Sequence, residues 1–214
     1  MSAKVTVVDY GSGNLLSVCR ALRYCGAEVT TTESATEISQ AARLVVPGVG
    51  AMAASMRNLE ARNLVEPIRA YGGTERPLLG ICVGMQIMFD AGEEFGTHPG
   101  LGLLSGRVRR IPSRRHDGAR RKIPHIGWNT LKPAPGVNGW DQTILRGLAT
   151  EPAAYFLHSF AVEPVESSIR LADCEYEGVQ VCSVVKKGAI YGCQFHPEKS
   201  GEVGLAILRN FLTL

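Results

Sequence analysis

One cysteine of this sequence, Cys82, stands in a setting that suits a nucleophile. It lies in the stretch LLGICVGMQ between Gly80 and Gly84, a Gly-x-nucleophile-x-Gly pattern typical of a sharp turn from a strand to a helix. The two glycines would let strand and helix approach closely around a strained backbone. Unpaired N–H groups at the helix start favour a thiolate, and the N–H of Val83 would face an oxyanion. The alternative is a small apolar side chain that fills a core strand.

A general base for this cysteine is offered by the stretch QFHPEKSG. His196 follows a strand-like run and Glu198 lies two residues on, so an extended backbone would point both side chains to the same side. A carboxylate beside an imidazole fixes its tautomer and supports the imidazolium form. A histidine that merely closes a strand is the alternative for this motif alone. His98 and His116 fall in polar stretches, where we expect them to be solvated.

A glycine-rich turn, PGVGAMA, follows another strand-like run. Gly48 and Gly50 fit the Gly-x-Gly-x-x-Ala pattern of a dinucleotide-binding turn. The acidic residue that this pattern requires about 20 residues further on is missing, because the next strand ends in Cys82. We therefore expect the N–H groups of the turn to face an anion other than a pyrophosphate. The cysteines contain no C-x-x-C pair, which argues against a zinc ribbon, and we expect no metal and no cofactor.

The elements that must position these residues predict an α/β fold. Strand-like runs alternate with helical patterns over the first hundred residues, which predicts an open, mostly parallel sheet flanked by helices. The helical text after PGVG reaches RAYGG, and a further helix, VGMQIMF, is expected after Cys82. From about residue 105 the strand-like runs are separated only by turns, which predicts an antiparallel extension in the C-terminal half. One of these runs is AYFLHSFAV. Ser200 is expected to cap a closing helix over 201–214, and we expect a single domain over 1–214.

Composition narrows the class of protein. The chain has 214 residues, 45% of them hydrophobic and 20% charged, and no apolar stretch approaches the roughly 18 residues that span a bilayer. Six cysteines are too few for a disulfide scaffold of this length, and the first residues do not resemble a signal peptide, so we expect a cytoplasmic protein. The net charge of +3 is too small to indicate nucleic-acid binding. Residues 107–122 hold eight basic side chains, which predicts a solvated loop; a basic nucleotide- or RNA-binding patch is the alternative.

Taken together, PGVG, GICVGMQ and HPEKSG resemble the class I, or triad, glutamine amidotransferases over essentially the whole chain. The resemblance implies that Cys82 attacks the side-chain amide of glutamine, while His196, oriented by Glu198, protonates the departing ammonia and then activates water. It also implies an oxyanion hole and a glutamine pocket. The oxyanion hole would comprise Val49, Gly50 and Val83, and the pocket Gly50, Gln86, Glu94, His158 and Ser159.

Four further features resemble the branch of this family that serves histidine biosynthesis: Met85 and the stretches DYGSGNLLSV, PHIGWN and YFLHSF. That branch implies a heterodimer with a (β/α)8-barrel cyclase, which uses the ammonia to make imidazole glycerol phosphate and aminoimidazole carboxamide ribonucleotide. Asn14, Trp128 and Asn129 are the expected interface residues. A glutaminase subunit of another pathway, such as pyridoxal phosphate synthesis, and a cysteine hydrolase that acts alone are the alternatives.

Overall fold

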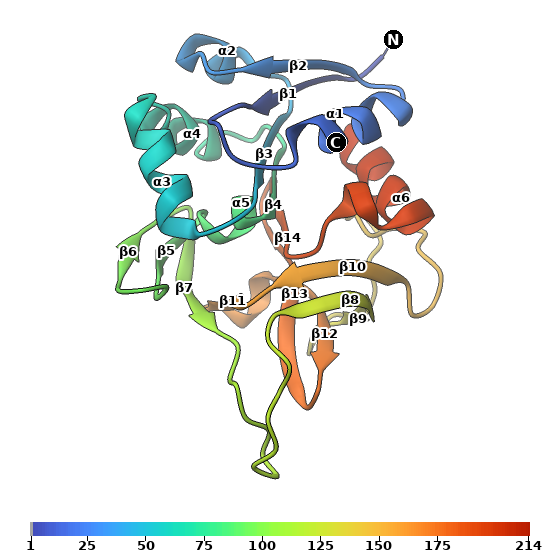
Figure 1. Cartoon of the computed structure of the whole chain (residues 1–214). Helices are drawn as coiled ribbons and strands as arrows, with labels where there is room; N and C mark the ends of the chain where they lie inside the picture. Colours follow the sequence, from blue (N-terminus) through green and yellow to red (C-terminus); the bar gives the residue numbers. More distant parts are fainter. Residues whose placement is uncertain (1) are drawn as a thin grey trace.

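The computed structural model describes residues 2–214, and within that range the chain forms an eight-stranded sheet with two smaller sheets beside it (Figure 1). The strands of the large sheet follow one another across it as β2 (Glu28–Thr32), β1 (Lys4–Val8), β3 (Leu44–Gly48), β4 (Leu78–Cys82), β14 (Ile190–Cys193), β13 (Val179–Lys187), β12 (Arg170–Tyr176) and β9 (Lys132–Pro133). Neighbours from β2 to β14 are parallel, and neighbours from β14 to β9 are antiparallel. The predicted parallel sheet with an antiparallel C-terminal extension is confirmed.

The helices cover both faces of the parallel part. They are α1 (Leu15–Tyr24), α2 (Ala35–Gln40), α3 (Met52–Ala61), α4 (Val65–Gly72), α5 (Val83–Gln86) and α6 (Gly201–Leu212), with short 3-10 turns η1 (Ser167–Ile169) and η2 (Pro197–Lys199). Figure 1 shows α1 and α6 together on one side of the sheet and α3 and α4 on the other. The single helical segment expected between PGVG and RAYGG is divided into two helices, α3 and α4, because Asn63 adopts a left-handed φ of 57° between them.

Two small sheets frame the C-terminal end of the parallel strands. One orders β11 (Phe160–Pro164), β7 (Leu104–Arg110), β5 (Phe89–Gly92) and β6 (His98–Pro99); the other pairs β10 (Ala153–His158) with β8 (His125–Thr130). The run AYFLHSFAV, expected as one strand, is divided at Ser159, because β10 pairs with β8 while β11 pairs with β7. Ser159 is thus the point at which the chain passes from one sheet to another.

The basic segment is only in part the expected loop: Arg107, Arg109 and Arg110 lie in strand β7, and the residues after this strand form a projecting loop at the lower end of the molecule in Figure 1. Residues 112–120 are all exposed. The backbones of Arg114 and Arg120 pair across the loop as an isolated antiparallel β-bridge. Arg121 is the exception: it is 5% exposed, and its guanidinium donates hydrogen bonds to the carbonyl oxygens of Arg114 and Glu177. Arg121 therefore stabilises the base of the loop instead of being solvated. No helix within residues 2–214 has the length and apolarity needed to cross a membrane.

Candidate functional site

Cys82 occupies a strained turn between β4 and α5. Its φ of 54° and ψ of −111° lie in a region that non-glycine residues seldom adopt. The flanking glycines are required sterically: a Cβ on Gly80 would lie 2.6 Å from the carbonyl oxygen of Gly84, and a Cβ on Gly84 would overlap the carbonyl oxygen of Val46. These contacts are with backbone, which side-chain movement cannot relieve. The structure therefore has the geometry of the nucleophile turn expected from the sequence.

The helix after this turn is shorter than predicted. The expected helix over VGMQIMF ends after one turn at Gln86, and the chain enters β5 at Phe89. The reason lies in the backbone hydrogen bonds: the carbonyl oxygens of Ile87 and Met88 accept from the N–H groups of Leu101 and Leu103, at 2.7 and 2.9 Å. Those carbonyl groups join a neighbouring segment instead of a helix.

His196 and Glu198 form the predicted pair by another route. The backbone after His196 turns into η2 instead of staying extended, and His196 Nδ1 lies 2.8 Å from Glu198 Oε1. Both side chains are almost inaccessible, 3% and 1% exposed. Ser200 stands at the N-cap position of α6, but its hydroxyl makes no capping bond; it donates instead to the carbonyl oxygen of His196, at 2.7 Å. The hydrogen bond from Ser200 thus fixes the backbone at His196.

The imidazole of His196 favours its charged form. Burial by itself lowers its pKa, but hydrogen bonds with Cys82 and Glu198, together with the negative charge of both groups, outweigh burial and raise the pKa to about 9. The imidazolium form of His196 therefore fits this site at neutral pH. Such an imidazolium can donate a proton to a leaving group and accept one afterwards.

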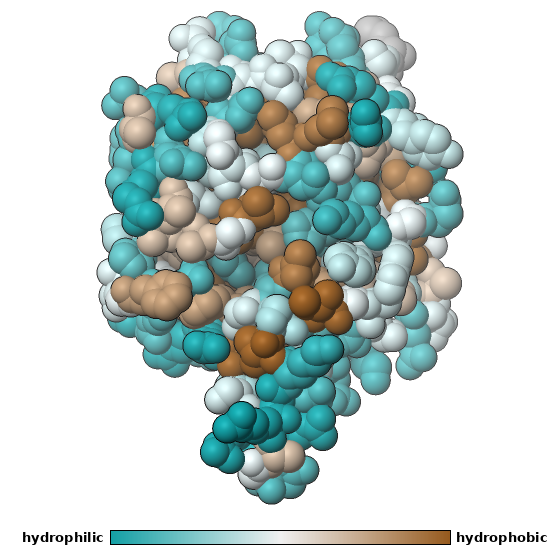
Figure 2. Space-filling view, viewed as in Figure 1, coloured by the Kyte–Doolittle hydropathy of each residue, from teal (hydrophilic) through white to brown (hydrophobic). Residues whose placement is uncertain are grey.

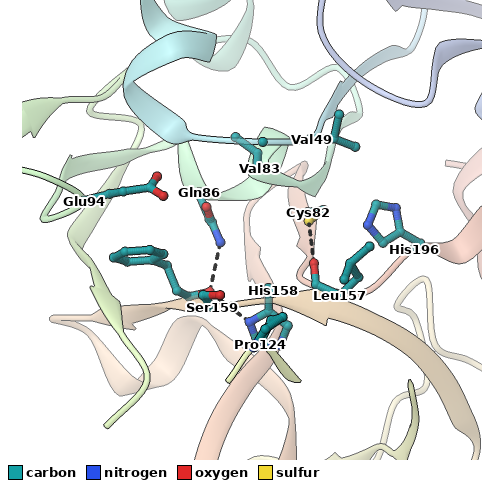
Figure 3. A pocket seen from close by; sticks show the side chains of 12 residues that line it. Val49, Cys82, Val83, Gln86, Glu94, Pro124, Leu157, His158, Ser159 and His196 are labelled. Atoms are coloured by element: carbon teal, nitrogen blue, oxygen red, sulfur yellow. Dashed lines mark hydrogen bonds between the residues drawn. The ribbon is translucent and has the colours of Figure 1, made fainter. Parts of the chain in front are cut away.

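Cys82 opens into a cavity of about 250 Å³ that gathers most of the predicted site residues (Figure 3). In Figure 3, Cys82 lies between His196 at one end and Gln86 with Glu94 at the other. The cavity is small in comparison with pockets for drug-sized ligands, so it suits a small polar substrate. Its lining comprises Val49, Gly50, Cys82, Val83, Gln86, Glu94, Pro124, Leu157, His158, Ser159, Phe160 and His196. All of the residues expected in the oxyanion hole and the pocket are among them.

Comparison with known proteins assigns the family. The family described as "Glutamine amidotransferase class-I" matches residues 6–214. The chain belongs to this family. It is 47% identical to the imidazole glycerol phosphate synthase subunit HisH 1 of Legionella pneumophila strain Lens, over 99% of this chain and 100% of that protein. It is 43% identical to the imidazole glycerol phosphate synthase subunit HisH of Geobacillus kaustophilus, over 97% of this chain and 95% of that protein.

Solved structures of low sequence identity share the amidotransferase fold. The structure of PurLQS from Thermotoga maritima superimposes with a TM-score of 0.75 at 17% identity, and covers 100% of this chain and 99% of that one. The crystal structure of a glutamine amidotransferase matches with a TM-score of 0.71, also at 17% identity, over 98% of this chain and 99% of that one. These matches agree with the α/β architecture and say nothing about substrate.

In this amidotransferase the turn that carries Val49 and Gly50 is tethered to the loop after β1. Tyr10 donates its hydroxyl hydrogen to the carbonyl oxygen of Pro47, at 2.6 Å, and Ser12 donates to the carbonyl oxygen of Val49, at 3.0 Å. These bonds restrict how the peptides of the PGVG turn are oriented. The stretch DYGSGN therefore supports the wall of the cavity.

Two of the three expected interface residues direct their side chains inward. Asn14, in the same loop, donates its amide hydrogen to Glu198 Oε1, at 3.2 Å. Asn129 donates to the carbonyl oxygen of Glu175, at 2.9 Å. Trp128 differs, because it is 59% exposed on the outer face of β8. The structure therefore places Asn14 on the carboxylate of the His–Glu pair.

Two neutral histidines lie at one wall of the cavity: His158 lines it, and His125 lies behind His158. His158 Nδ1 lies 2.9 Å from the carbonyl oxygen of Phe160, which can only accept, so Nδ1 carries the hydrogen. His158 Nε2 therefore accepts from His125 Nδ1, at 3.1 Å, and His125 Nε2 is left to accept from the amide of Asn129, at 3.4 Å. Burial lowers the pKa of His125 to about 4 and that of His158 to about 3. Both imidazoles are thus neutral with assigned tautomers.

Gln194 is a site residue that the sequence reasoning missed. Its side chain is fully buried, and its amide nitrogen lies 3.8 Å from Cys82 Sγ. A signal was present in the sequence: Gln194 precedes His196 by two positions at the end of a strand-like run, and residues two apart in a strand share a face. A polar residue on the same face as a proposed catalytic histidine therefore pointed to the site.

Proposed function

We propose that this chain is the glutaminase subunit of an imidazole glycerol phosphate synthase, which hydrolyses glutamine and delivers the ammonia to a cyclase subunit. The observation that carries the proposal is the joint geometry of Cys82 and the buried His196–Glu198 pair at one small cavity. The near full-length similarity to two HisH subunits supports the same pathway. We place the reaction in the cytoplasm and assign the whole chain to one amidotransferase domain.

The proposed reaction begins with attack by the Cys82 thiolate on the side-chain amide carbon of glutamine. The oxyanion that forms would be held by main-chain N–H groups of Val83 and of the turn at Val49 and Gly50, which line the same cavity. His196, as an imidazolium, donates its proton to the amide nitrogen, and the C–N bond breaks to release ammonia. This step leaves a glutamyl thioester on the cysteine.

The second half of the reaction regenerates the enzyme. His196, now neutral, accepts a proton from water as the water oxygen attacks the thioester carbonyl carbon. The proton returns to the sulfur or remains on the imidazole as the C–S bond breaks, and glutamate leaves. Glu198 keeps the imidazole ring in one tautomer throughout, because His196 Nδ1 is held on its carboxylate, while Asn14 restrains the carboxylate itself.

The cyclase partner is proposed to be a (β/α)8-barrel in a heterodimer with this chain. We place the partner on the outer face of β8 and β10, where Ile126, Trp128 and Leu157 are 52%, 59% and 40% exposed. Figure 2 shows hydrophobic residues gathered near the middle of the face that carries these two strands. Patches of exposed apolar side chains are typical of protein–protein contacts. Leu157 also lines the cavity, so a partner docked there would lie close to the released ammonia.

The experiment that tests this function compares two substitutions in a coupled assay with a (β/α)8-barrel cyclase subunit. Cys82→Ser should abolish synthesis from glutamine but leave synthesis from added ammonium salt near the wild-type rate. The matched control is Cys25→Ser, because Cys25 donates only to the carbonyl oxygen of Leu205, a bond that a serine hydroxyl also makes. The control should retain both activities.

Three results would contradict the proposal. Loss of both the glutamine and the ammonium activity in Cys82→Ser would mean that the cysteine is structural. Ammonia release without any product in the presence of cyclase and its ribosyl-phosphate substrate would point to another pathway. Hydrolysis of other amides or peptides, but not of glutamine, would identify a cysteine hydrolase that acts alone.

A further inference from the structure

Gln194 connects the proposed nucleophile to the glutamine pocket through its side-chain amide. Its Oε1 lies 3.1 Å from Gln86 Nε2, and its Nε2 lies 3.8 Å from Cys82 Sγ. Its position is well held, since its side chain is fully buried and its main-chain N–H donates to the carbonyl oxygen of Ser183, at 2.9 Å. The residue therefore sits behind the cavity and touches two groups that the reaction uses.

The orientation of both amides follows from one carbonyl group. The oxygen of Phe160 can only accept, and the side-chain end of Gln86 that lies 3.0 Å from it must be the nitrogen. That nitrogen has a second hydrogen, which points to Gln194, so the facing atom of Gln194 is its oxygen. The nitrogen of Gln194 then faces Cys82. The hydrogen-bond network thus aims an N–H group at the sulfur.

Some groups around Cys82 Sγ favour the thiol, and others favour the thiolate. The carbonyl oxygen of Leu157, 3.9 Å away, can accept from a thiol but repels a thiolate. The imidazolium of His196 and the N–H of Gln194 both favour the thiolate. The His196 cation also becomes neutral during the reaction as it donates its proton, whereas the amide N–H of Gln194 cannot titrate.

We propose that Gln194 is a positioning residue for the glutaminase reaction, which stabilises the Cys82 thiolate through its amide N–H and orients Gln86 through its amide oxygen. The inference rests on the proposed function, because it assigns a task only if Cys82 is the nucleophile. The two tasks belong to two ends of one side chain. They can therefore be separated by substitutions that keep one end and change the other.

The test uses Gln194→Glu and Gln194→Leu in the full chain, with Ser183→Ala as the matched control. Glutamate keeps an acceptor for Gln86 but, once ionised, offers the sulfur no hydrogen and adds a negative charge. Leucine removes both ends. Ser183 is also fully buried, but its hydroxyl donates to the carbonyl oxygen of Val181. Iodoacetamide alkylation of Cys82, quantified by peptide mass spectrometry across a pH series, reports the thiolate directly, and glutamine kinetics with cyclase report KM and kcat.

We expect alkylation near neutral pH to slow by about tenfold in both Gln194 variants and to recover to the wild-type plateau at high pH. The KM for glutamine should stay within about twofold in Gln194→Glu and rise in Gln194→Leu, because only leucine removes the second of the two acceptors that orient the Gln86 amide, leaving the carbonyl oxygen of Phe160 alone. Ser183→Ala should match wild type in both assays. Recovery at high pH separates thiolate stabilisation from a distorted fold, in which the plateau itself would fall.

An alkylation profile for Gln194→Glu that superimposes on wild type would refute the proposal that Gln194 stabilises the Cys82 thiolate. An equal KM in Gln194→Leu and wild type would refute the proposal that Gln194 orients Gln86. Either result, obtained while wild type still hydrolyses glutamine, leaves the proposed function standing. Wild-type protein that neither alkylates selectively at Cys82 nor hydrolyses glutamine with cyclase would instead refute the proposed function itself.

Discussion

The buried histidine pair should make the fold sensitive to acid. His125 and His158 have pKa values lowered by burial to about 4 and about 3, from an ordinary value of 6.5. Below pH 6.5 the unfolded chain binds protons that the folded pair excludes, so stability falls as the pH decreases. The environment of the pair offers no carboxylate to offset this: His125 is stacked between Phe156 and Tyr176, at 4.7 and 3.9 Å between ring centroids.

The size of the effect follows from proton linkage. For a pKa of about 4 in the folded state and 6.5 in the unfolded state, moving from about pH 8 to about pH 5 removes about 2 kcal/mol of unfolding free energy. His158 contributes a similar loss over the same range. His196 acts with the opposite sign, because its pKa is raised; its contribution is fully present below pH 6.5 and is lost as the pH rises through about 9. The comparison must therefore be between wild type and a variant that lacks only one member of the pair.

The informative perturbation is His125→Gln, which can still donate a hydrogen bond to His158 Nε2 but does not titrate. Urea unfolding at about pH 8 and about pH 5 should show that the variant loses about 2 kcal/mol less than wild type on acidification. His116→Gln, on the exposed loop, is the control and should lose as much as wild type. An equal loss in wild type and His125→Gln would refute the neutral buried pair, and so would a larger loss in the variant.

Three further substitutions probe the site. Gly84→Ala should lower the unfolding free energy by about 2 kcal/mol or more in urea titrations, because the new Cβ would overlap the backbone at Val46. Gly73→Ala is the control: its Cβ would have its nearest neighbour at 3.4 Å, so the unfolding free energy should change by less than about 0.5 kcal/mol. Glu198→Gln should reduce glutamine-dependent kcat by a factor of about 10² to 10⁴ while ammonium-dependent synthesis with cyclase persists. Trp128→Ala should weaken cyclase binding by about tenfold in titration calorimetry with little change in stability, because the indole is exposed.

The parts of the site that are local in sequence were predictable. The strand, the turn at Cys82 and its two glycines lie within residues 78–84, and the steric need for glycine follows from the turn itself. The pairing of His196 with Glu198 was also predicted, although the backbone reaches it through a 3-10 turn instead of an extended strand. Two residues apart, either conformation brings imidazole and carboxylate together, so the prediction succeeded with the wrong backbone.

Contacts between distant segments were not predictable in the same way. Asn14 and Glu198 are separated by 184 positions, and they meet because α1 and α6 pack together on one side of the sheet. The early end of α5 has a similar cause, since its would-be helical carbonyl groups bond to a segment that begins at Gly100. Local propensity favours a helix there, and the tertiary hydrogen bonds override it.

The carbonyl oxygen of Phe160 joins the two hydrogen-bond networks of the cavity. It accepts from Gln86 Nε2 at 3.0 Å and from His158 Nδ1 at 2.9 Å. A carbonyl oxygen has two lone pairs, so both donors can be satisfied at once and neither amide nor imidazole is free to flip. One network leads through Gln86 towards the nucleophile, and the other leads through His125 to β8. Because alternate residues of β8 point to opposite faces, the strand that carries exposed Trp128 also carries His125, which lies behind the cavity residue His158. A partner that docks on the outer face of β8 would therefore contact the strand whose His125 is hydrogen-bonded to the cavity residue His158.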